Sequence, residues 1–162
     1  MGHEWFQLYL NGNHISNAGA KEYDVAKKKI SENVEKIYNS ISLLLENLNL
    51  KTTDCFVMGF SQGGMMAFEL GQILQNKLAG LAIISSRIIS KEHKPNNAFL
   101  KTPIFISHGA QDAVLPISNY NESIEVLKKY NYNYENYLIE SDEHTMSQET
   151  ITFFQNFIKK NI

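Results

Sequence analysis

The stretch from residue 54 to residue 74 constrains the fold more than any other part of this chain. A compact apolar run ends in the pentapeptide 59–63, Gly-Phe-Ser-Gln-Gly, and a long apolar segment follows at once. This order predicts a strand, a sharp turn and a helix. In that context a Gly-x-Ser-x-Gly pattern holds its serine on a strained elbow, with the hydroxyl exposed and a helix N-terminus behind it. We therefore interpret Ser61 as a candidate nucleophile.

The pentapeptide alone is weak evidence, because glycine and serine are common residues. A random chain of this length would contain the pattern with a chance of about 5%. The strand-like run before it and the helical run after it supply the context that the pattern requires. A phosphate-binding loop is the main alternative for a glycine-rich turn that opens a helix, but the lysine that the P-loop pattern demands is missing. We set the phosphate loop aside.

Strand-like and helix-like segments alternate along the rest of the chain. We expect strands at residues 79–85, 103–109 and 134–139, and helices at residues 20–48, 117–129 and 147–159. We expect residues 90–102 to form a polar loop, whereas residues 1–19 fit either a short strand or a packed loop. Strands that alternate with helices indicate βαβ units and a parallel sheet. The sequence therefore predicts one α/β domain over residues 1–162.

The helix expected at residues 20–48 has the clearest pattern. Its apolar residues recur at steps of three and four, which places them in one stripe along an amphipathic helix. The charged residues fall largely off this stripe, as on a solvated face. The stripe residues are Ile30, Val34, Ile37, Ile41, Leu44, Leu45 and Leu48.

Composition excludes several classes of function. The net charge is −2 and no sustained block of lysine or arginine occurs, which argues against nucleic acid as a partner. No apolar run approaches the roughly 18 residues that a transmembrane helix needs. The single cysteine, Cys55, cannot form an internal disulfide, and the N-terminus lacks the pattern of a secretory signal. We expect a soluble globular protein in the cytoplasm.

Three polar residues of catalytic type follow the expected strands. Ser61 follows the first strand, Asp112 the third and His144 the fourth. The carboxyl ends of parallel strands gather at one edge of a sheet, so we expect these residues to lie close together. Their order along the chain is that of the triad in α/β-hydrolases. In such a triad a neutral imidazole takes the proton of the serine hydroxyl, and a carboxylate orients the imidazole and stabilises the imidazolium.

Other interpretations of these residues stay open at the level of sequence. Asp112 could be a turn or helix-cap residue, and His144 could be an exposed loop histidine. Asp142 and Glu143 are rival candidates for the acid, although residues one and two positions before the histidine are badly placed to orient the far nitrogen of its ring. The five histidines show no ligand spacing such as His-Glu-x-x-His, so we expect no metal.

Several segments resemble the phospholipase/carboxylesterase family, which includes the acyl-protein thioesterases. These segments are Trp5-Phe6, Gly-Phe-Ser-Gln-Gly-Gly at 59–64, Ser85-Ser86-Arg87, residues 103–116 and His144. The resemblance covers nearly the whole chain. It implies hydrolysis of carboxylic esters or thioesters of small or lipid-like acyl substrates through an acyl-enzyme. It implies Ser61 as the nucleophile, His144 as the base and then the acid, and Asp112 as the orienting carboxylate, with no cofactor or metal.

The chain also departs from the family. Members carry, ahead of the Trp-Phe segment, further strands and a His-Gly-x-Gly loop that supplies one oxyanion-hole amide, and this chain starts after them. We therefore expect an N-terminally truncated α/β-hydrolase, with a mostly parallel sheet of about four strands and flanking helices. The other oxyanion donor, the backbone amide of Gln62, is retained. Loss of one such donor typically lowers turnover by about a hundred- to a thousandfold.

The departure has a consequence for the elbow strand. In the strand order of the family, loss of the preceding strand leaves residues 55–60 at the edge of the sheet. An apolar, unpaired edge strand is a template for association. We expect this edge to be covered, either by residues 4–10 folding back or by a second copy of the chain in a homodimer.

Two classes of function therefore stay open. The first is a carboxylesterase or thioesterase of the serine hydrolase type. The second is a catalytically impaired remnant, or one half of a split protein, that acts as a binding or assembly module. The serine, histidine and aspartate in triad order favour the first, and the segment expected to be missing favours the second.

Overall fold

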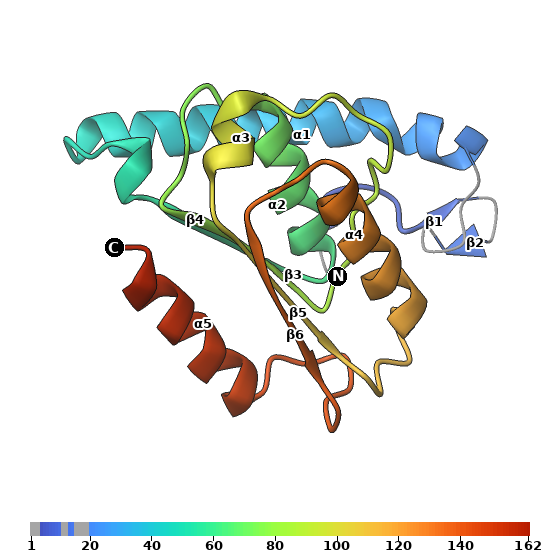
Figure 1. The fold of residues 1–162 in the computed structure, drawn as a ribbon. Coiled ribbons are helices and arrows are strands. Elements are labelled where there is room, and N and C mark those ends of the chain that lie inside the picture. Colours follow the sequence, from blue (N-terminus) through green and yellow to red (C-terminus); the bar gives the residue numbers. More distant parts are fainter. Residues whose placement is uncertain (1–3, 11–12, 15–19) are drawn as a thin grey trace.

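A computed structural model of the protein describes residues 4–10, 13–14 and 20–162 (Figure 1). Four parallel strands form its central sheet in the order β3-β4-β5-β6. The strands are β3 (Phe56–Phe60), β4 (Gly80–Ile84), β5 (Ile104–Gly109) and β6 (Tyr134–Ile139). In register, Phe56 lies opposite Gly80, Leu81 opposite Ile104, and Ile104 opposite Tyr134. The predicted parallel sheet of about four strands is confirmed.

Helices cover both faces of this sheet (Figure 1). The helices are α1 (Ala20–Asn47), α2 (Gln62–Ile73), α3 (Asn97–Lys101), α4 (Ile117–Lys129) and α5 (Gln148–Lys160). Helix α5 lies on one face, and the other helices lie on the opposite face. Along β4, Leu81 packs into the core beneath α2 and α4, whereas the next residue, Ala82, packs against Phe157 of α5. Both faces of the central strands are therefore buried, as in other parallel sheets.

The N-terminal half of α1 packs as its stripe predicts. Ile30 and Val34 are buried against Met65 and Met66 of α2. At the end of the stripe Leu45 is also buried, at 8% exposed, and the prediction is wrong only for Leu44 and Leu48, which are 56% and 58% exposed. The physical reason is direction: neighbouring helix residues point about 100° apart, so Leu44 faces solvent where Leu45 faces the protein, and Leu48 follows the last residue of α1.

Two further segments differ from the expectations. The expected polar loop at 90–102 contains the short helix α3, because the side chain of Asn96 caps the helix by accepting a hydrogen bond from the backbone N–H of Phe99, and Phe99 enters the core. A small antiparallel pair is formed by β1 (Tyr9–Leu10) and β2 (Asn13–His14). Phe6 before this pair is buried beside α1 and α2.

Strand β3 lies at one edge of the sheet. Strand β1 pairs with β2 and not with β3, so residues 4–10 do not extend the sheet. Met58 and Phe60 on β3 are 47% and 38% exposed. Cover of this edge by a second copy stays a prediction. None of the helices in the described part of the chain is both long enough and apolar enough to cross a membrane.

Candidate active site

The candidate nucleophile lies on a tight turn between β3 and α2. Ser61 has φ 51° and ψ −120°, a conformation that residues other than glycine rarely adopt. Its backbone N–H donates to the carbonyl of Ile84 on the neighbouring strand, at 2.9 Å. A Cβ atom on Gly59 would meet the carbonyl oxygen of Gly63 at 2.0 Å, so strand and helix approach too closely for any side chain there. The turn therefore has the strained elbow geometry that the pentapeptide predicts.

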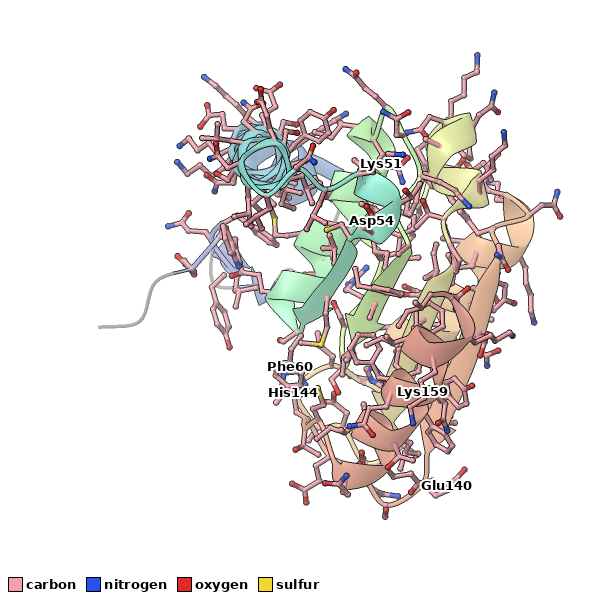
Figure 2. All side chains as sticks on the ribbon, turned by 90° about the vertical axis from the view of Figure 1, so that its left-hand side faces the viewer. Lys51, Asp54, Phe60, Glu140, His144 and Lys159 are labelled. Carbon is pink, nitrogen blue, oxygen red and sulfur yellow. The ribbon has the colours of Figure 1, made fainter. Side chains whose placement is uncertain are left out.

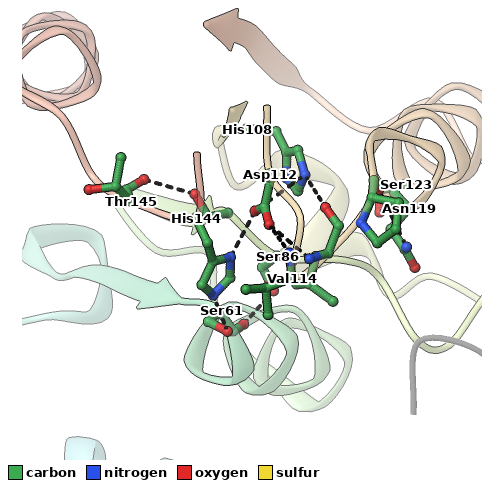
Figure 3. Close-up of polar contacts among 12 residues, drawn as sticks. Ser61, Ser86, His108, Asp112, Val114, Asn119, Ser123, His144 and Thr145 are labelled. Atoms are coloured by element: carbon green, nitrogen blue, oxygen red, sulfur yellow. Dashed lines mark hydrogen bonds and ion pairs between the residues drawn. The ribbon is translucent and has the colours of Figure 1, made fainter. Parts of the chain in front are cut away.

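The structure brings Ser61, His144 and Asp112 into one chain of hydrogen bonds (Figure 3). The Nε2 atom of His144 lies 2.9 Å from Ser61 Oγ, and its Nδ1 atom lies 2.7 Å from Asp112 Oδ2. The carboxylate is a pure acceptor, so Nδ1 carries the proton toward Asp112 and Nε2 is left to accept from the serine hydroxyl. This arrangement can remove the proton of Ser61 when its oxygen attacks a substrate.

The carboxylate of Asp112 is fully buried and uses both oxygens. Its Oδ1 atom accepts hydrogen bonds from the backbone N–H groups of Val114 and Leu115, at 2.9 and 2.8 Å. Its Oδ2 atom faces His144, whose side chain is 18% exposed. From the sequence, Asp112 could be either a turn residue or the acid of the triad. In the structure it does both, because one oxygen holds the turn and the other faces His144.

The rival carboxylates point elsewhere. Asp142 is buried, and the hydroxyl of Thr150 donates to its side chain at 3.4 Å. The carbonyl of Asp142 accepts from the backbone N–H of Gln111, and that of Glu143 accepts from the N–H of Thr145. These contacts shape the loop that carries His144, and it is Asp112 that meets the histidine ring.

His108 is a residue near the site to which we gave no role from the sequence. It is buried at the end of β5, and its Nε2 atom donates to the carbonyl of Leu115 at 2.8 Å. The same nitrogen lies 3.6 Å from Asp112 Oδ2. Burial lowers the pKa of His108, which keeps its imidazole neutral, and the ring stacks on Tyr120. Its place at the carboxyl end of a strand was the signal that could have identified it.

Gln62 contacts the N-terminal segment as well as the elbow. It is the first residue of α2, so its backbone N–H lies among the helix amides that have no acceptor in a preceding turn. Its side-chain Nε2 donates to the carbonyl of Phe6 at 2.7 Å, and its Oε1 accepts from the N–H of Trp5 at 2.9 Å. The side-chain contacts tie residues 5 and 6 to the elbow, a link that no local pattern in the sequence indicates.

The surroundings of the triad are largely apolar. The rings of Phe60 and His144 lie 5.0 Å apart, at the end of β3 that is opposite to Lys51 and Asp54 (Figure 2). An apolar groove is lined by Trp5, Val57, Met58 and Gly63, together with residues of α1 and α2. One of its lining residues, Gly63, belongs to the elbow and follows Ser61 by two positions in the sequence. Within the described part of the chain, no group of three or more His, Cys, Asp or Glu side chains could hold a metal ion.

Comparisons with known proteins add independent information. A model of the family described as Phospholipase/Carboxylesterase matches residues 1–162. Acyl-protein thioesterase 1 of Debaryomyces hansenii is 26% identical over 158 residues, which cover 95% of this chain and 65% of that protein. Acyl-protein thioesterase 1 of Saccharomyces cerevisiae is 29% identical over 156 residues, which cover 87% of this chain and 66% of that protein. The chain spans slightly less than two thirds of the length of these relatives.

A solved structure shows the same fold. The crystal structure of esterase PE8 matches with a TM-score of 0.84 at 22% identity, over 99% of this chain and 71% of that chain. The protein therefore has an α/β-hydrolase-like fold, with a parallel four-stranded sheet and flanking helices.

Proposed function

This chain belongs to the phospholipase/carboxylesterase family, and on that premise we propose that it is a serine hydrolase. Its substrates are carboxylic esters or thioesters with small or lipid-like acyl groups. The observation that carries the proposal is the continuous hydrogen-bond chain from Asp112 through His144 to Ser61. The apolar groove, which Gly63 of the elbow helps to line, suits an acyl chain. A cytoplasmic location stays a prediction.

The geometry supports a two-step mechanism. Ser61 Oγ attacks the acyl carbonyl carbon while His144 Nε2 takes the hydroxyl proton, and Asp112 stabilises the imidazolium that forms. The tetrahedral intermediate collapses to an acyl-serine, and His144 gives its proton to the departing alkoxide or thiolate. A water molecule then loses a proton to His144 and attacks the acyl-serine. Collapse of the second intermediate releases the carboxylic acid and returns the proton to Ser61.

The oxyanion of each intermediate needs hydrogen-bond donors. We assign one donor, the backbone N–H of Gln62, which lies directly after the nucleophile at the N-terminus of α2. A second donor is typically worth about a hundred- to a thousandfold in turnover. With Gln62 as the one assigned donor, we expect both acylation and deacylation to be slow, since each passes through a tetrahedral oxyanion.

A second candidate function is a binding or assembly module that keeps the elbow for structural reasons. The observation that favours it is the unpaired edge of β3, where Met58 and Phe60 are exposed beside the site. In this case the chain would bind a partner along β3 and would hydrolyse nothing measurable by itself.

One experiment separates the two candidates. The protein is incubated with a fluorophosphonate probe, which reacts with activated serines, and is then assayed for turnover of short-chain esters and thioesters. Hydrolase function predicts labelling of the wild type, none of Ser61→Ala, and unchanged labelling of Ser118→Ala, which alters an exposed serine on α4. Labelling of Ser61 with negligible ester or thioester turnover would favour the second candidate, a binding or assembly module whose serine is still reactive. Absence of labelling in the wild type would overturn the hydrolase.

A further inference from the structure

Two adjacent serines that follow β4 contact the elbow of the nucleophile and the loop that carries the base. We propose that Ser85 and Ser86 are positioning residues, which hold the elbow and the histidine loop in the relative placement that the reaction needs. This inference rests on the proposed hydrolase function. Both side chains are 1% exposed, and the strand that leads to them lies between the strand of the nucleophile and the strands of the acid and the base.

Ser85 connects β4 to the loop that carries the base. Its hydroxyl donates to the carbonyl of Thr145, the residue after His144, at 2.9 Å. Its backbone N–H donates to the carbonyl of Ser107 on β5, so the residue is also anchored to the sheet. Ser85 has φ 42°, a left-handed conformation that is uncommon for serine. Strained backbone of this kind persists where the surrounding structure holds it, and it gathers at functional sites.

Ser86 connects β4 to the elbow. Its hydroxyl donates to the carbonyl oxygen of Ser61 (Figure 3). That same oxygen accepts from the backbone N–H groups of Gly64 and Met65, at 3.0 and 3.3 Å. A Cβ on Gly64 would lie 2.6 Å from Cβ of Ser86, so the first turn of α2 and the segment after β4 are in close contact. The nucleophile is thereby held from its carbonyl side, which leaves its Oγ free to face His144.

The two serines bear on the distance between the nucleophile, Ser61 Oγ, and the base, His144 Nε2. Ser61 and His144 are 83 residues apart in the sequence and lie on loops that follow opposite edges of the sheet. A misplacement of about 1 Å between catalytic groups can lower a rate by about a hundredfold. Ser85 and Ser86 link both loops to one strand end, so one dipeptide controls the separation between Ser61 Oγ and His144 Nε2.

A purely structural role would look different. Buried hydroxyls that only satisfy carbonyl groups would contribute to stability and leave the reaction of folded protein unchanged. Ser107 provides the matched control, because it is a buried serine on the next strand whose Oγ has no hydrogen-bond partner among the described residues. Ser85→Ala and Ser85→Gly form a second matched pair. Both remove the hydroxyl, but only glycine also relieves the positive φ.

The test measures fluorophosphonate labelling of Ser61 as a function of probe concentration. We expect Ser85→Ala, Ser85→Gly and Ser86→Ala each to lower the maximal labelling rate by about tenfold, the value of one hydrogen bond. The half-saturating probe concentration should not change, and Ser107→Ala should react like the wild type. Equal maximal rates in all folded variants, or an equal loss in Ser107→Ala, would overturn the positioning role.

A second readout does not depend on reactivity. The proton on His144 Nδ1 that faces Asp112 can be followed by NMR in the unreacted protein. We expect its signal to shift or broaden in both Ser85 variants and to stay unchanged in Ser107→Ala. A wild type that does not react would overturn the hydrolase, whereas an unchanged Nδ1 signal in the Ser85 variants would overturn the positioning inference.

Discussion

At the scale of single residues, the least expected group is the carboxylate of Glu69 on α2. One oxygen accepts a hydrogen bond from the hydroxyl of Ser90 at 2.8 Å, and the other is buried with no hydrogen-bond partner among the described residues. Burial is the largest cause that raises the pKa of Glu69 to about 7, and the bond from Ser90 partly opposes it. Folding therefore favours the protonated form of this side chain.

The raised pKa predicts a pH dependence of stability. The folded state holds the Glu69 proton more tightly than the unfolded state does. The stability that this proton adds is therefore fully present below pH 4.5 and is lost as the pH rises through 7. We expect this loss to be about 3 kcal/mol. The measurement is the free energy of unfolding in urea at several pH values between 5 and 8. In Glu69→Gln, the fall of this free energy with rising pH should be smaller by the part that Glu69 contributes. The control, Glu46→Gln on the exposed face of α1, should keep it.

Two histidines titrate in the same range with the opposite sign. Burial lowers the pKa of His93 and of His108, so their contributions grow as the pH rises. Both are present in wild type and variant alike, so the difference between the two proteins isolates Glu69. An identical pH profile for the wild type and Glu69→Gln would contradict the prediction.

At the scale of elements, the elbow between β3 and α2 depends on glycine at one position and not at another. A Cβ on Gly59 would collide with the backbone of Gly63, which cannot move without unwinding the first turn of α2. A Cβ on Gly63 would meet nothing within 4 Å. The two glycines lie four residues apart, so they form a matched pair for mutation.

We expect Gly59→Ala to destabilise the protein by about 3 kcal/mol, in the range of an overpacked core. We expect Gly63→Ala to be neutral or to stabilise by up to about 1 kcal/mol, since alanine is the better helix former. The measurement is the urea midpoint and slope of each variant. If both variants were equally stable, the close approach of strand and helix at the elbow would be wrong.

At the scale of the whole molecule, the two edges of the sheet differ in chemistry. Strand β6 carries Glu135, which is paired with Lys160 at 2.7 Å, and such charges protect an edge from association. Strand β3 has no charged residue and no proline. A two-fold related copy could pair antiparallel along it, with Phe56 opposite Phe60 of the second copy. This pairing would continue one sheet across two molecules.

We therefore expect the protein to form a concentration-dependent dimer, measured by light scattering. Met58→Lys should give a monomer, because it places a charge beside the paired strand. Leu138→Lys, on the opposite edge strand and 37% exposed, should leave the dimer intact. A stable wild-type monomer whose outward amides at residues 55–60 exchange freely would show that a second copy does not cover this edge.

The sequence by itself determined the four strands of the parallel sheet and the long helices, although not the short helix α3. The helix at 117–129 and the strand at 134–139 were predicted to the residue, because hydrophobic repeats and turn residues act locally. The three candidate catalytic residues could be placed at strand ends on the same principle, since parallel strands bring their carboxyl ends to one edge.

Only the tertiary structure decided how distant residues meet. It showed that one oxygen of Asp112 faces His144 while the other holds a turn, and that Ser85 reaches the carbonyl of Thr145, 60 residues away. It also showed that Leu45 near the end of α1 is buried whereas its neighbour Leu44 is exposed. Such contacts depend on the order of strands and the lengths of neighbouring helices, which no local repeat in a sequence encodes.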